Sequence, residues 1–101
     1  MSNKQLENNY DAEGIVVYVG LPESFGKMGQ HHKRILALKM YEGNFETSVP
    51  FEFINRSMSQ LDNISVGDRV IVNFQLSGNF QEREGGIRWF SRLKGRGAQK
   101  I

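Results

Sequence analysis

Hydrophobic and polar positions alternate with a period of two over most of the chain, which is the pattern of half-buried β-strands. A β-branched run over residues 14–20 is closed by a glycine and soon after by a proline, so a first strand is expected there. The alternation returns over 33–41, 45–53, 69–77 and 87–94. The pattern therefore predicts five strands.

One segment departs from this period. Ile54, Met58 and Leu61 are spaced i, i+4 and i+7, which is the spacing of one helix face. Ser57 and Gln60 fit a capping box at the start of such a helix. We predict a short helix between Asn55 and Asp62.

Two polar stretches that contain glycine, residues 21–32 and 78–86, are expected to be loops. Pro50 falls within the third predicted strand and lacks the N–H that a strand ladder needs. An edge or a bulge is therefore expected at this proline.

The order of elements is three strands, a short helix and two strands. This order predicts an all-β fold, a five-stranded OB-fold barrel with a short helix between strands three and four. We place the OB-fold domain at residues 13–95, between a flexible N-terminal segment, 1–12, and a basic flexible tail, 96–101. Ligands of OB-folds lie across strands two and three, between the loops that join strands one to two and four to five.

Composition narrows the classes of function. The chain of 101 residues has the length of one domain, and it has no cysteine for disulfides, thiol catalysis or cysteine zinc sites. No apolar run approaches a membrane span of roughly 20 residues, and the first nine residues lack the apolar stretch of a signal peptide, so a cytoplasmic protein without membrane contact is expected. His31 and His32 are adjacent, so on a strand they point to opposite faces, and no metal site is expected. With no nucleophile–base pair or carboxylate dyad, we expect neither an enzyme nor a cofactor.

Charge is unevenly distributed along the chain, although its net value is only +2. Residues 27–41 carry four cations and no acid, and residues 83–101 carry six cations and one acid, Glu84. Both basic blocks begin within or beside the two predicted loops. This arrangement favours a polyanionic partner if the fold brings the blocks together.

Single-strand binding needs aromatic faces for the bases and cations for the phosphates. The aromatic candidates for stacking are Trp89, Tyr41, Phe80, Phe25 and Phe45. The candidate phosphate ligands are Lys27, Lys33, Arg34, Arg83, Arg88 and Arg92. Phe51 and Phe74 are expected to point into the barrel.

Three motifs carry a resemblance to a known family: Val49-Pro50-Phe51-Glu52, Val66-Gly67-Asp68-Arg69-Val70 and Arg88-Trp89-Phe90. The chain resembles small OB-fold proteins of bacteria and phages that are related to single-stranded-DNA-binding proteins. The resemblance implies the bacterial cytoplasm or a phage-infected cell as the location, and replication or recombination proteins as possible partners. It also implies a homo-oligomer, either a dimer or a tetramer.

Together these observations lead to the hypothesis of a protein that binds single-stranded DNA in replication or recombination, largely independently of sequence. Two alternatives remain open at this point. The chain is an OB-fold protein that binds RNA, or it is an OB-fold module that contacts another protein.

Overall fold

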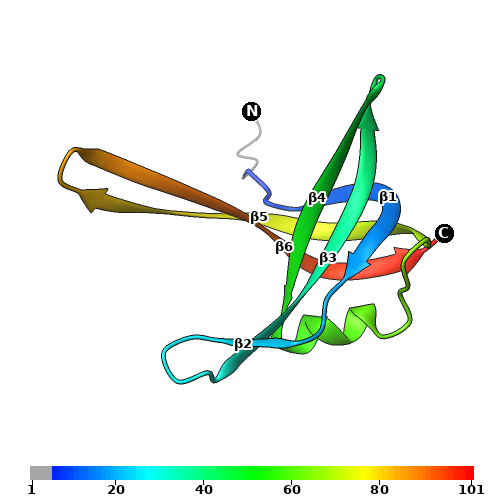
Figure 1. Cartoon of the computed structure of the whole chain (residues 1–101), viewed down its shortest axis with the longest axis horizontal. Coiled ribbons are helices and arrows are strands. Elements are labelled where there is room, and N and C mark those ends of the chain that lie inside the picture. The colour runs from blue at the N-terminus through cyan, green and yellow to red at the C-terminus, as the bar shows by residue number, and fades with distance from the viewer. Residues whose placement is uncertain (1–5) are drawn as a thin grey trace, which may run out of the picture.

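The computed structural model describes residues 6–101, which are almost entirely β (Figure 1). The expected fold class is confirmed, because residues 6–101 form five long strands and one helix, which lies between the third and the fourth of them. The elements are β1 (Tyr10–Val19), β2 (Glu23–Phe25), β3 (His31–Glu42), β4 (Phe45–Ile54), the 3-10 helix η1 (Asn55–Leu61), β5 (Arg69–Arg83) and β6 (Gly86–Lys100).

Hydrogen bonds join the five long strands into a closed ring, which makes an OB-like barrel. Strand β1 pairs with both β3 and β5, β3 pairs with β4, and β5 pairs with β6, all antiparallel. The ring closes where β4 meets β6 in parallel, with Glu52 opposite Lys94. A closed ring leaves few free strand edges, which protects the barrel against edge-to-edge association.

The barrel interior is filled by side chains from alternate strand positions, as the period-two pattern predicts. Phe51 is fully buried and Phe74 packs against it, with ring centroids 5.1 Å apart, so both point inward as expected. Gly95 on β6 is also buried, and the ring of Phe53 occupies the space that a Cβ atom there would need. The buried hydrophobic residues are Val16, Leu36, Leu38, Phe51, Phe53, Leu61, Ile64, Val70 and Val72.

The prediction of a loop over residues 78–86 is wrong. Strands β5 and β6 stay paired as far as Arg83 and Gly86, so only Glu84 and Gly85 form the turn. Gly85 and Gly86 both have positive φ values, 96° and 143°, which glycine adopts without steric cost and which allow so tight a turn. The outer part of this hairpin, residues 78–91, projects away from the barrel and is called the arm below (Figure 1).

The ends of the domain are more ordered than the sequence indicated. Residues 10–12, expected to be flexible, lie in β1, where Tyr10 is opposite Phe74. The tail from residue 96 onward was also expected to be flexible, but β6 continues to Lys100. The N–H of Ile101 donates to the carbonyl of Arg69 over 3.0 Å. Residues 1–5 of the predicted N-terminal segment lie outside the described residues.

The predicted loop over residues 21–32 contains the short strand β2, which pairs with the start of β3. The predicted bulge at Pro50 is absent, because the β3–β4 register is unbroken and Pro50 lies opposite Ala37. The expected edge is present instead. In the described structure, the residues of β4 that precede Glu52 pair only with β3. Pro50 therefore needs no N–H on its open side.

The predicted capping box does not form. Helix η1 begins at Asn55 with no side-chain cap, and the Ser57 hydroxyl donates to the Ile54 carbonyl over 2.9 Å. The helix is of the 3-10 type, and it contributes Leu61 to the core. No helix within residues 6–101 has the length and apolar character of a membrane span.

Candidate nucleic-acid interface

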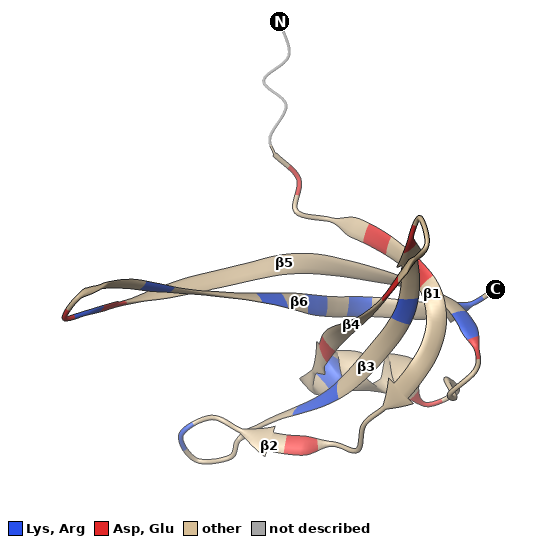
Figure 2. Ribbon diagram, turned by 45° about the horizontal axis from the view of Figure 1, so that its top comes forward, with Lys and Arg blue, Asp and Glu red and all other residues tan. Residues whose placement is uncertain are grey.

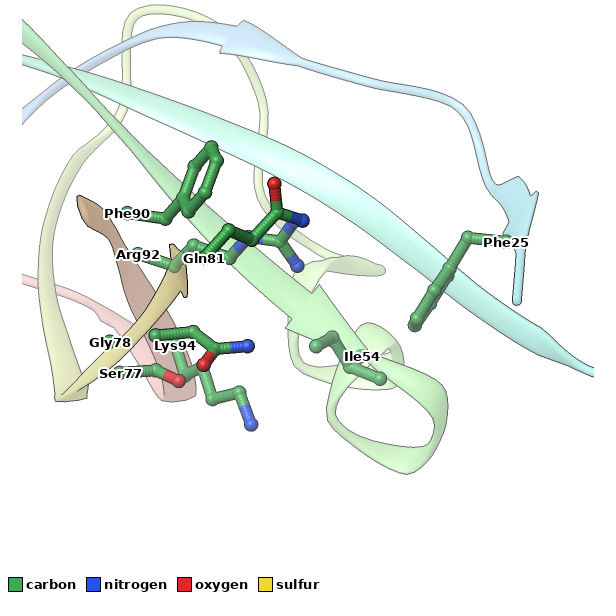
Figure 3. A pocket seen from close by; sticks show the side chains of 9 residues that line it. Phe25, Ile54, Ser77, Gly78, Gln81, Phe90, Arg92 and Lys94 are labelled. Atoms are coloured by element: carbon green, nitrogen blue, oxygen red, sulfur yellow. The ribbon is translucent and has the colours of Figure 1, made fainter. Parts of the chain in front are cut away.

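A groove of 390 Å³ lies where β2, the end of β4 and the root of the arm meet (Figure 3). Phe25 of β2 stands on one side of it, and the β5 and β6 side chains stand on the other. Phe25 belongs to the connection between the first two long strands, and the arm is the connection between the last two; these two connections flank the ligands of OB-folds. The lining residues are Phe25, Ile54, Ser77, Gly78, Asn79, Gln81, Phe90, Arg92 and Lys94.

Strand alternation determines which side chains of β6 reach the groove. Directly opposed residues of an antiparallel pair share a face, and the faces alternate along each strand. Arg88, Phe90, Arg92 and Lys94 therefore lie on one face of the β5–β6 hairpin. Their partners across β5 are the polar, uncharged residues Gln81, Asn79, Ser77 and Gln75. This face holds three cations and one aromatic ring with no acid among these partners.

Each aromatic ring of the groove has a cation near its face. Lys33 Nζ lies 5.7 Å from the ring centroid of Phe25, and Arg88 Cζ lies 5.5 Å from that of Phe90. The Phe25 ring also packs against His31, with centroids 5.3 Å apart. Flat rings beside cations supply both the stacking surfaces and the positive charge that a single strand requires.

One carboxylate is set among these cations. Glu52 lies 3.8 Å from Lys33 Nζ through Oε1 and 3.6 Å from Arg92 Nε through Oε2. Its side chain is largely buried, and the Oε1 atom has no hydrogen-bond partner. Glu52 therefore connects a β3 cation and a β6 cation that both lie at the groove.

Two of the predicted stacking residues lie on the opposite face of the arm. Phe80 and Trp89 are directly opposed across β5 and β6, with ring centroids 5.4 Å apart. Their exposed fractions are 49% and 72%, and neither residue lines the groove. The structure thus separates Trp89 and Phe80 from the predicted cations Arg88 and Arg92, with which they were grouped.

The other two predicted aromatics lie at the far end of β3 and β4. Tyr41 packs near Lys39, whose Nζ is 5.9 Å from the ring centroid, and lines a separate hollow with Glu13 and Arg69. Phe45 is exposed beside the β3–β4 turn. The structure does not bring either ring to the groove.

The remaining predicted cations differ in whether other groups of the protein already hold their side chains. Arg34 is held by the fold, since its Nε donates to the Gly20 carbonyl over 2.9 Å and its Nη1 lies 3.5 Å from Asp62. Lys27 lies in the exposed turn between β2 and β3. Arg83 lies near the tip of the arm and donates to Gln81 over 2.9 Å.

A comparison with models of protein families found a match for this chain. The model described as a domain of unknown function, DUF3127, matches residues 11–96. The chain belongs to the DUF3127 family. The match covers the whole barrel wall that carries the groove, from Phe25 to Lys94. No curated protein matches the sequence.

Among the aromatic and charged residues at or beside the groove of this DUF3127 domain, sequence reasoning missed Phe90, Lys94 and Glu52. The signal for the first two was present, because residues 88, 90, 92 and 94 share one strand face by their even spacing. Glu52 gave no such signal, since its neighbours Lys33 and Arg92 come from other strands. Within residues 6–101, no group of three His, Asp or Glu side chains gathers as metal ligands would.

Proposed function

We propose that this protein binds single-stranded DNA in the groove, largely without sequence preference, in replication or recombination. The observation that carries the proposal is the pair of rings on opposite sides of the groove, Phe25 and Phe90, each with a cation beside it. Every base has a flat face, so stacking on such rings is worth about 1–3 kcal/mol per base and tolerates any sequence.

The cations of the groove would meet the phosphates. Lys33, Arg88, Arg92 and Lys94 line or border it, and Lys33 and Arg92 are already paired with Glu52. Binding that neutralises about three or four phosphates gives a slope of log affinity against log salt near −2 to −3 for a single strand.

The test is a fluorescence anisotropy titration of a labelled oligo-dT at several salt concentrations. We expect binding at low salt that weakens with the slope given above, and weaker binding to a duplex of the same length. The absence of binding to oligo-dT at low salt would contradict the proposal. Tighter binding to a matched oligo-rU would favour the alternative that the groove binds RNA.

A second candidate function, contact between two copies of the chain, is favoured by the apolar face of the arm. Phe80, Ile87 and Trp89 are exposed on this one face, which Leu76 continues at the root of the arm, and a two-stranded ribbon alone is marginally stable in water. The same patch on two copies can pack across a two-fold axis without any charge match. We expect a concentration-dependent dimer in sedimentation velocity that Trp89→Ser weakens. A wild-type protein that stays monomeric at its highest soluble concentration would refute this second candidate.

A further inference from the structure

A second hollow lies beside helix η1, close to the groove. Its volume is 550 Å³, and it is lined by Ile54, Asn55, Arg56, Ser57, Gln60 and Arg96. Two arginines from separate elements, η1 and β6, thus contribute to one concave surface. Neither the family match nor the proposed groove assigns any role to this hollow.

The hollow adjoins the groove. Ile54 lines both of them, and Lys94 of the groove is two residues from Arg96 of the hollow along β6. Arg96 is the extra residue of a β-bulge, because Gly95 is opposite Phe74 while Gly97 is opposite Asn73. A bulge bends its strand and re-aims a side chain, and Arg96 is exposed there.

Arg92 and Lys33 at the groove are paired with Glu52, but four other cations along this path have no carboxylate partner in the part of the chain that the structure describes. Among residues 6–101, Arg56, Arg88, Lys94 and Arg96 form no ion pair. The other paired cations, Arg34, Arg69 and Lys100, lie outside the path. Residues 86–100 contain no acid, and the blue bands in Figure 2 follow β6 from the arm toward the barrel. Unpaired cations in a row attract a polyanion more strongly than paired ones.

We propose that the bound nucleic acid runs lengthwise along β6, from the groove into this hollow, where Arg56 and Arg96 hold phosphates. This inference rests on the proposed function and adds to it a second phosphate site and a path. Arg88 and Arg96 are eight residues apart, so the path is roughly 26 Å long at about 3.3 Å per strand residue. The bound strand then leads away from Tyr41 and Phe45, at the opposite end of β3 and β4.

The experiment compares a short oligo-dT of about 5 nucleotides with a long one of about 20 nucleotides. These lengths lie near the lower end and above the upper end of the usual site size of an OB-fold. The variant is Arg56→Ala with Arg96→Ala. The control is Lys39→Ala with Lys100→Ala, which removes the same charge elsewhere on the barrel. Circular dichroism and thermal melts establish that each variant is folded, and Arg56→Gln with Arg96→Gln replaces the alanine variant if it is not.

We expect the arginine variant to bind the short strand within about twofold of wild type and the long strand at least about fivefold more weakly. Its salt slope on the long strand should be about 1.4 smaller in magnitude, because two phosphate contacts at about 0.7 each are lost. An unchanged affinity for the long strand, or an equal loss in the control, would overturn the path and leave the groove in place. A wild-type protein that binds neither strand would overturn both proposals.

Discussion

Trp89 and Phe90 are consecutive residues of β6, yet they face opposite sides of the arm. Phe90 lines the groove beside Arg92, whereas Trp89 packs against Phe80 on the other face. One hairpin therefore presents a basic face that continues the barrel groove and an apolar face that does not. Substituting each of these two adjacent rings in turn therefore tests the two surfaces separately.

Lys33 and Arg34 form a second such pair. Lys33 borders the groove, while Arg34 is bound to the Gly20 carbonyl and to Asp62. Lys33→Ala should weaken oligo-dT binding by about threefold to tenfold and reduce the magnitude of the salt slope by about 0.7.

Arg34→Ala should instead lower the free energy of unfolding by about 1–3 kcal/mol, because it leaves a carbonyl without its donor. The folded variant should bind oligo-dT as wild type does. Urea denaturation measures the first effect and anisotropy the second. If Arg34→Ala weakened binding and Lys33→Ala lowered the free energy of unfolding instead, Arg34 rather than Lys33 would face the bound strand.

Glu52 holds two groove cations that a bound phosphate would also attract. Glu52→Gln should therefore tighten oligo-dT binding by about threefold to tenfold and steepen the salt slope, since Lys33 and Arg92 become free. Glu46→Gln is the matched control, on the same strand but near the β3–β4 turn. Weaker binding by the folded Glu52→Gln variant would mean that the carboxylate positions the cations for the ligand.

Gly95 is required by packing rather than by backbone conformation. A Cβ atom at this position would overlap the Phe53 ring, which is itself fully buried. Gly95→Ala should lower the free energy of unfolding by about 1–3 kcal/mol, the usual cost of overpacking a core. Gly97→Ala is the control, because the nearest atom to its added Cβ is Gln60 Oε1 at 3.7 Å. Equal stability of the two variants in urea denaturation would exclude this packing account.

The fold was predictable because the period-two pattern and the single helical segment follow directly from side-chain burial. The arm was not, because the polar residues of 78–86 resemble a loop when no core covers them. Cross-strand pairing between β5 and β6 and the turn at Gly85 extend the hairpin beyond the barrel. Likewise, Ala98 packs against the core in a segment that composition alone describes as a basic tail.

The candidate site was predictable in its place and charge but only partly in its residues. Strand order indicated the groove, and Phe25, Lys33 and Arg92 lie at it. Trp89 was predicted as a stacking residue and Phe90 was not, although Phe90 shares a strand face with the predicted cations Arg88 and Arg92. Arg34 shows a different limit, since its partners Gly20 and Asp62 are distant in sequence and only the fold brings them together.

The proposed function requires that single-stranded DNA binds in the groove and stacks on its rings. The most direct measurement is the anisotropy of a labelled short oligo-dT with Phe90→Ala and Trp89→Ala, both confirmed as folded. We predict that Phe90→Ala weakens binding by about tenfold, which corresponds to about 1.4 kcal/mol, while Trp89→Ala stays within about twofold. A loss confined to Trp89→Ala would place the strand on the other face of the arm and contradict the groove.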